Sequence, residues 1–322
     1  MKTNMLKFSL IIPVYNTEQY LIQCIESCEK QDIACEEYEI IAINDGSMDN
    51  SLCILEQLQS KYENIVIISQ ENSGLSAARN TGLNVAKGRY IWFIDSDDWI
   101  ECNVLGYLYK ELSENNLECI KIGFKKIFNS GVSGLLEDKY NKEKSSVLTG
   151  VQMLNSQMSK SFYAWSFIYD RLFFIENGFI FKDRLIYEDL QLIPKILLKA
   201  KRISYLHSHY YNYRQRDDSI VHNVTPRMID SLFFILEDYT ALISKLTDKQ
   251  QKHFCYYLTE HIKVMLLVLL SKLNTDSENY ISQFILRYPH LKIYNRMNIN
   301  EKICILLYNL SNKAALFILR HK

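Results

Sequence analysis

The stretch Tyr90-Ile91-Trp92-Phe93-Ile94-Asp95-Ser96-Asp97-Asp98 decides the fold of this chain. Its five apolar residues in a row predict a buried strand. The strand runs directly into three carboxylates, which repel one another and lose solvation unless something compensates their charge. A divalent cation bound to a phosphorylated ligand would compensate it. A solvated acidic turn that also caps the next helix is the alternative reading.

The residues before this stretch alternate between strands and helices. Short apolar runs predict strands over 8–13, 38–43 and 65–68, and 90–94 completes the set. Apolar residues at helical spacing predict helices over 18–29, after 47–49 and over 74–86, with Ser47 or Asp49 as the cap of the second. This alternation predicts an α/β fold with parallel strand pairing and helices on both faces of the sheet.

Polar residues stand at three of the predicted strand ends. Tyr15 follows the first strand, Asp45 ends the second, and the acids from Asp95 onwards end the fourth. Ligands of parallel sheets bind beyond the carboxyl ends of the strands, so these residues are expected on one rim. Asp45 could accept from a base N–H or a ribose hydroxyl, Tyr15 could pack on a base or in the core, and a carboxylate–metal pair could take a diphosphate.

Composition and missing motifs exclude several protein classes. The sequence lacks GxGxxG after the first strand and lacks GxxxxGK[ST], which argues against a nicotinamide, flavin or P-loop enzyme. A formal net charge of zero argues against a nucleic-acid partner held by charge. The eight cysteines form no CxxC pair, and no signal peptide is visible, so we expect a cytoplasmic protein with reduced thiols. The longest aliphatic run, 264–270, is too short to span a bilayer.

Four motifs occur in a fixed order across the first hundred residues: Ser9–Asn16 (SLIIPVYN), Asn44–Ser47 (NDGS), Gly74–Gly82 (GLSAARNTG) and Phe93–Asp98 (FIDSDD). Together they resemble the motif set of family-2 glycosyltransferases with the GT-A fold. The resemblance implies a Rossmann-like, mostly parallel sheet with flanking helices over 1–223. The donor half would cover about 1–100 and the acceptor half about 101–223. A C-terminal helical region is expected over 224–322.

The same resemblance implies a nucleotide-diphosphate-sugar donor, with UDP expected, and a divalent cation, Mn²⁺ or Mg²⁺. By position, Pro13 and Tyr15 would line the nucleotide pocket, and Asp45 would bind the base. The remaining donor-side residues carried over are Arg79 near the nucleotide and diphosphate, Asp95 at the ribose or metal, and Asp97 on the metal. A helix-surface ion pair is the alternative for Arg79, and capping of the next helix is the favoured reading for Asp98.

In the second half, Ala164–Arg171, Asn177–Phe181 and Tyr187–Leu190 resemble a block found in capsular and exopolysaccharide enzymes of this family. Ser166 and Phe167 stand where the family often has Lys or Arg, so that donor contact is not carried over. The resemblance makes Asp189 the base that takes the acceptor proton in an inverting transfer, with Glu188 orienting the acceptor or the loop. Capping of a helix over 190–200 is the alternative reading.

Further along, Tyr205–Ile220 resembles another segment of the family. Arg214 and Arg216 are expected to close over the leaving diphosphate, because guanidinium matches phosphate oxygens. Some relatives supply a metal-binding histidine from this region. The sequence offers His207, His209 and His222 without ranking them.

Helical apolar spacing predicts helices over 228–244 and 253–273 and near the C-terminus. Apolar residues of the last segment (Ile303, Leu306, Leu307, Leu310, Ala314, Phe317 and Ile318) fall on one face with basic residues around them. This pattern suits peripheral contact with an anionic membrane, or packing against the chain or a second subunit.

The acceptor expected from the resemblance is a saccharide or lipid-linked saccharide. Two other functions stay open: a sugar nucleotidyltransferase, and an inactive scaffold subunit of a polysaccharide assembly complex.

Overall fold

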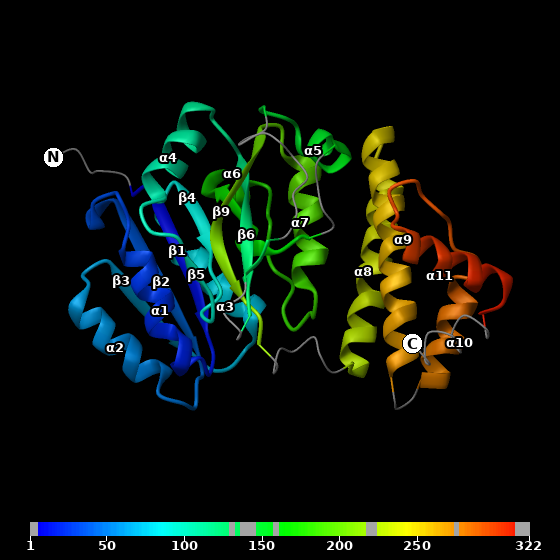
Figure 1. Cartoon of the computed structure of the whole chain (residues 1–322), viewed down its shortest axis with the longest axis horizontal. Coiled ribbons are helices and arrows are strands. Elements are labelled where there is room, and N and C mark those ends of the chain that lie inside the picture. The colour runs from blue at the N-terminus through cyan, green and yellow to red at the C-terminus, as the bar shows by residue number, and fades with distance from the viewer. Residues whose placement is uncertain are drawn as a thin grey trace. The chain divides into compact units, whose positions relative to one another are not determined.

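The computed structural model describes residues 6–128, 133–135, 146–156, 161–216, 224–273 and 277–312. The chain divides into two compact units, Met1–Asp217 and Asp218–Lys322. In Figure 1 the first unit is a sheet with helices around it, and the second consists of helices.

The first unit alternates strands and helices along its first half, as predicted. Its strands are β1 Phe8–Val14, β2 Tyr38–Asp45, β3 Ile65–Gln70, β4 Tyr90–Phe93, β5 Trp99–Ile100, β6 Cys119–Ile127, β7 Ser133–Leu135, β8 Phe167–Asp170 and β9 Ile203–Arg214. Its helices are α1 Glu18–Glu29, α2 Ser51–Lys61, α3 Leu75–Val85, α4 Leu105–Glu114, α5 Gly150–Ser156, α6 Arg171–Glu176 and α7 Glu188–Lys199, with short 3₁₀ turns at Cys35–Glu37 and Ala164–Ser166.

The strands form one sheet in the order β3-β2-β1-β4-β8-β6-β9-β5, with β7 paired to β6. Strands β3, β2, β1 and β4 are parallel, which confirms the predicted pairing. Strand β8 lies antiparallel between β4 and β6, while β6 and β9 are parallel. The sheet is therefore parallel in its first half and mixed beyond it.

Helices cover both faces of the parallel half. Leu10 of β1 joins Leu21 of α1 in the core on one face, while Ile11 meets α3 on the other. A Cβ on Gly82 of α3 would collide with the Ile11 side chain, so the absence of a side chain lets this helix lie directly on β1. Burial on both faces explains why β1 reads as a continuous apolar run.

The N-cap position of α2 is Asn50, which makes no side-chain cap hydrogen bond, so the prediction of Ser47 or Asp49 as the cap is wrong. Asp49 still contacts the start of the helix, because its Oδ1 accepts from the Ser51 N–H at 2.9 Å, whereas the Ser47 hydroxyl accepts from the Asn16 N–H at 3.1 Å. Most of the segment over 129–146 lies outside the described residues. Its described part, β7, pairs antiparallel with the end of β6.

The second unit contains α8 Pro226–Lys245, α9 Lys249–Lys272, α10 Ser277–Arg287 and α11 Ile299–Leu310, so the helices predicted over 228–244 and 253–273 are confirmed. Within the described residues, α9 is the one helix whose length and composition would allow it to cross a membrane. About two thirds (67%) of its most apolar stretch is buried inside the protein, as is typical of a helix in a hydrophobic core.

Candidate active site

The carboxyl ends of β1, β2 and β4 meet at one edge of the sheet, because the three strands are parallel and in register. Asp45 ends β2, Tyr15 follows β1, and the acids from Asp95 onwards follow β4. The structure thus brings the three predicted polar strand ends to a common rim, as expected.

Arg79 of α3 lies at the centre of this rim and contacts three carboxylates. Its guanidinium is 2.6 Å from Glu188 Oε1, 3.0 Å from Asp95 Oδ1 and 3.1 Å from Asp189 Oδ1. Only 1% of the Arg79 side chain is exposed, so the alternative of a helix-surface ion pair is wrong. Burial opposes the charge of Arg79, but the three carboxylates outweigh it and raise the pKa of the guanidinium.

The loop before α7 is fixed by the neighbour of Arg79. Asn80 donates to the Phe181 carbonyl at 2.8 Å and accepts from the Phe181 N–H at 3.0 Å, and the Phe181 ring lies 5.2 Å from the Arg79 guanidinium. Tyr187 then takes a left-handed conformation with φ of 65°, which is strained for a bulky residue. This turn delivers Glu188 and Asp189 in the first turn of the helix.

Asp189 has the environment that a general base needs. Its Oδ2 accepts from the Ala164 N–H at 2.9 Å, and 18% of the side chain remains exposed. Burial raises its pKa to about 7; Arg79 opposes this shift and Glu188 adds to it. Asp189 Oδ1 contacts Arg79 of α3 and Asp189 Oδ2 accepts from the Ala164 N–H, so neither oxygen caps an amide of α7. A carboxylate with this pKa is suited to taking a proton near neutral pH.

The predicted metal ligand Asp97 lies against the predicted diphosphate-binding arginines. Asp97 Oδ2 is 3.0 Å from Arg216 Nε, and Arg214 Nε donates to the Asp97 carbonyl at 2.9 Å. Arg214 also donates to Gln23 at 2.6 Å and stacks over Tyr20. Burial, followed by the charge of Asp95, raises the pKa of Asp97.

The prediction that Asp98 caps the following helix is wrong. Strand β5 follows it, and its carboxylate accepts from the Tyr211 hydroxyl at 2.8 Å and from the Arg214 N–H at 2.7 Å. Asp98 is 1% exposed, and burial, followed by the charge of Asp97, raises its pKa well above the usual value. Its role is to join the acidic turn to β9.

Asp45 holds the loop that leads into α3. Its Oδ1 accepts from Gln70 Nε2 at 2.7 Å and from the Ser73 N–H at 2.9 Å, and its Oδ2 accepts from the Gly74 N–H at 2.8 Å. Contact with a nucleotide base stays a prediction. Tyr15 is 48% exposed, so its alternative as a core residue is wrong, and its packing on a base stays a prediction.

The structure locates the other predicted site residues without giving them a role. Pro13 lies in β1, and His207 and His209 lie on β9. His222 is outside the described residues. Within the described part of the chain, no group of three or more His, Cys, Asp or Glu side chains is arranged to hold a metal ion.

The sequence did not predict a cluster of aromatic residues beside Asp95, Asp98 and Asp189. Tyr163, Trp165 and Tyr211 stack in parallel, and Tyr213 packs against the first two. The signal was available in part, because Tyr211 and Tyr213 are two residues apart on one strand and so share a face. The partner rings come from a distant segment, which strand periodicity alone does not identify.

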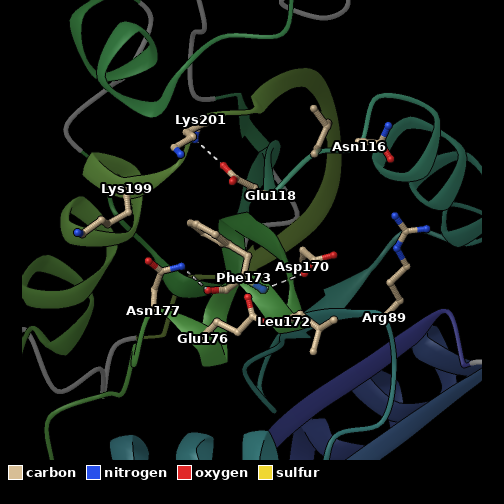
Figure 2. Close-up of a pocket in the computed structure, with 11 residues that line it drawn as sticks. Arg89, Asn116, Glu118, Asp170, Leu172, Phe173, Glu176, Asn177, Lys199 and Lys201 are labelled. Atoms are coloured by element: carbon tan, nitrogen blue, oxygen red, sulfur yellow. Dashed lines mark hydrogen bonds between the residues drawn. The ribbon is translucent and has the colours of Figure 1, made fainter.

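A hollow of about 580 Å³ lies at the opposite edge of the sheet, where β4, β6 and β9 begin, and Figure 2 shows the residues that line it. Its lining includes Arg89, which precedes β4, Glu118, which precedes β6, and Asp170, which ends β8. None of the predicted site residues lines it. The predicted site is therefore separate from this hollow.

The family model for glycosyl transferase family 2 matches residues 9–175, more than half of the chain. Glycosyltransferase GlyA of Streptococcus pneumoniae serotype 4 is 32% identical over 94% of this chain and 43% of its own length. The poly(ribitol-phosphate) beta-glucosyltransferase of Bacillus spizizenii is 29% identical over 88% of this chain and 45% of its own length. The chain thus spans less than half the length of these two curated relatives.

Solved structures show the same fold. The S. aureus protein TarS, residues 1–349, in complex with UDP-GlcNAc superposes with a TM-score of 0.64 at 21% identity, covering 91% of this chain and 94% of TarS 1–349. The mannosyltransferase PcManGT of Pyrobaculum calidifontis, in complex with GDP-Man and Mn²⁺, superposes with a TM-score of 0.57 at 12% identity, covering 98% of this chain and 86% of PcManGT. The motifs predicted the GT-A fold that these comparisons support, and the chain belongs to glycosyl transferase family 2.

Proposed function

We propose that this chain is an inverting, metal-dependent glycosyltransferase that moves a hexose from a UDP-sugar to a hydroxyl of a saccharide or lipid-linked saccharide. The observation that carries the proposal is the Arg79 cluster, which joins Asp95 on the donor side to Asp189 on the acceptor side. The UDP-GlcNAc complex of TarS supports a UDP donor. The names of the curated relatives, including a minor teichoic acid biosynthesis protein, support a role in cell-surface glycan synthesis.

The acids after β4 fit a divalent cation of the Mg²⁺ or Mn²⁺ type. Asp95 and Asp97 offer oxygen ligands, and burial, followed by the charge of Asp95, raises the pKa of Asp97 although Arg216 opposes the shift. A divalent cation would favour the ionised form of both carboxylates. Two carboxylates would leave the remaining positions to donor phosphates and water, which is common for Mg²⁺ sites. Such an ion, when bound, would neutralise the diphosphate and so make it a better leaving group.

Asp189 would take the proton of the acceptor hydroxyl as that oxygen attacks the anomeric carbon. Arg79 and the Ala164 N–H fix one oxygen each, so the carboxylate is oriented before the acceptor arrives. Attack from the face opposite the nucleotide would convert an α-linked donor into a β-linked product. Arg214 and Arg216 would bind the departing diphosphate, since guanidinium groups suit phosphate oxygens.

We also propose a cytoplasmic location with peripheral membrane contact through α11. Ile299, Ile303, Leu306 and Leu310 stand in one stripe at helical spacing, and all four are exposed. The predicted continuation over 313–322 lies outside the described residues. Cosedimentation with anionic liposomes should fall when Leu306 and Leu310 are both changed to Gln. Equal recovery of both proteins in the supernatant would contradict this proposal.

The catalytic proposal is tested with nucleotide binding and donor turnover together. In a thermal-shift panel, UDP and UDP-sugars should stabilise the protein more with Mn²⁺ than without, and Asp97→Ala should lose this difference. Asp189→Asn should keep the shift but lose transfer, while Asp183→Asn, at an exposed acid of the same loop, should keep both. Binding without turnover in the wild type would instead indicate an inactive scaffold.

A further inference from the structure

Three aromatic rings form a parallel column beside the acids. The Tyr163 and Trp165 ring centroids are 4.7 Å apart with planes 5° apart, and those of Trp165 and Tyr211 are 4.3 Å apart with planes 7° apart. Trp165 and Tyr211 are buried, at 2% and 0% exposure, whereas Tyr163 is partly exposed. Tyr213, also partly exposed, lies 5.8 Å from the Tyr163 ring. The column therefore has a buried inner end and an outer end that solvent reaches.

Each end of the column is tied to a different part of the site. At the inner end, the Tyr211 hydroxyl donates to Asp98 Oδ2 at 2.8 Å and accepts from the Asp95 N–H at 3.1 Å. At the outer end, the residue after Tyr163 supplies the N–H that binds Asp189 Oδ2. Burial raises the pKa of the Tyr163 phenol, and the charge of Asp189 adds to the shift.

We infer that Tyr163, with Tyr213 beside it, is the platform on which the pyranose ring of the acceptor lies. The inference rests on the proposed function and deepens it by naming the residues that would bind the saccharide acceptor. A pyranose has a flat face of C–H groups, and an aromatic ring offers a large, rigid apolar surface to such a face. The rest of the sugar's surface is hydroxyl groups, one of which would face Asp189.

The geometry favours a ring-shaped acceptor over an acyclic polyol phosphate. A polyol chain has no flat apolar face for Tyr163 to cover. The donor sugar is a second possible occupant, because it too is a pyranose. The contact of the Tyr163 segment with the base assigns the ring to the acceptor.

Saturation-transfer difference NMR tests this inference without knowledge of the natural acceptor. The probes are methyl β-glycosides of glucose, galactose and their N-acetyl forms, with ribitol 5-phosphate as the acyclic probe, all with UDP and Mg²⁺ present. At least one glycoside should give signals from its ring C–H protons in the wild type. Tyr163→Phe should bind that glycoside within about twofold of the wild type, and Tyr163→Ala about tenfold more weakly.

A matched variant controls for the general loss of a tyrosine ring. Tyr109 of α4 is also partly exposed and packs against two rings, those of Phe8 and Tyr90. Phe8 and Tyr90 begin β1 and β4, at the sheet edge away from the acids. Tyr109→Ala should therefore leave glycoside binding unchanged. Thermal melts of all variants show whether each remains folded.

Several results would overturn the inference. They are equal glycoside signals in the wild type and Tyr163→Ala, no signal from any glycoside, and signals from ribitol 5-phosphate alone. Hydrolysis of the UDP-sugar in the absence of acceptor tests whether the donor sugar lies on Tyr163. The KM for the UDP-sugar should be the same in Tyr163→Ala as in the wild type. A higher KM in the variant would place the donor sugar on the ring. Failure of the proposed function itself would appear separately, as no stabilisation of the wild type by UDP and metal.

Discussion

Replacing Arg79 with Met should destabilise the first unit strongly, and more at pH 8 than at pH 6. Arg79 is 1% exposed and is the partner of three carboxylates, whose own exposed fractions are 12–26%. Removing one partner of a buried ion pair costs about 3–5 kcal/mol. Because water partly reaches the carboxylates, we expect the lower end of this range at pH 8. For a unit of roughly 200 residues this corresponds to a melting temperature lower by about 6–12 °C.

The pH dependence follows from Asp189. Its folded-state pKa of about 7 lies above its ordinary value of 3.8, so the folded state loses stability as pH rises through the folded pKa. Arg79 lowers the pKa of Asp189, so this pKa is higher in the Arg79→Met variant than in the wild type. The variant therefore continues to lose stability at pH values where the wild type no longer does. At pH 6 the carboxyl of the variant is protonated, which removes one of the unpaired charges. The free energy of unfolding of the variant is therefore closer to that of the wild type at pH 6 than at pH 8.

Thermal unfolding followed by circular dichroism at the two pH values measures the effect. Arg202→Met is the matched control, because Arg202 is exposed and its guanidinium donates only to the Asn115 and Asn116 carbonyls in the described residues. It should cost less than about 1 kcal/mol at either pH. If Arg79→Met melts like this control, or loses as much stability at pH 6 as at pH 8, the reasoning is refuted.

Three further predictions follow from the site. Wild-type transfer should rise with pH around the Asp189 pKa of about 7, because only the ionised carboxylate takes a proton; a rate that stays flat from about pH 5.5 to 8.5 would contradict this. Arg216→Gln should bind Mn²⁺ about tenfold more tightly in calorimetry without nucleotide, because a guanidinium no longer competes for the carboxylate 3.0 Å away; unchanged affinity would argue against competition. Gly46→Ala should lower the free energy of unfolding in urea by about 1–3 kcal/mol, since φ is 72° and its Cβ would lie 2.8 Å from a backbone nitrogen. Gly178→Ala, with φ of 66° and nothing within 4 Å, should lose less, and equal losses would remove the steric part of the explanation.

The parallel half of the fold could be predicted because its signals are local. Each strand of this half is a short apolar run, and β1 and β2 are buried throughout, so their pattern is unambiguous. Parallel pairing then forces the strand ends onto one edge, which is why Asp45 and Asp95 could be placed on the same rim. The antiparallel insertion of β8 was not predicted, because its partners β4 and β6 precede it by long intervals of sequence.

The partners of individual side chains were beyond the sequence. A motif identified Arg79, yet its partner Glu188 is 109 residues away, and nothing local distinguishes a buried ion cluster from a surface pair. Asp98 was assigned to a helix cap for the same reason, since its partner Tyr211 is 113 residues away. Side-chain chemistry set what each residue could do. Contacts distant in sequence decided which of these roles the fold uses.

The position of Arg79 also bears on the order in which the site forms during synthesis of the chain. Arg79 and Asp95 are made early, within a half whose contacts are close in sequence, so this pair can form as soon as β4 joins the sheet. Glu188 and Asp189 leave the ribosome about a hundred residues later and must reach a guanidinium that is already paired with Asp95. A nascent or truncated chain would thus hold the donor-side acid in place with no base beside it. Correct docking of the second half completes the ion cluster, so a single buried arginine makes the proposed chemistry conditional on the folding of the whole unit.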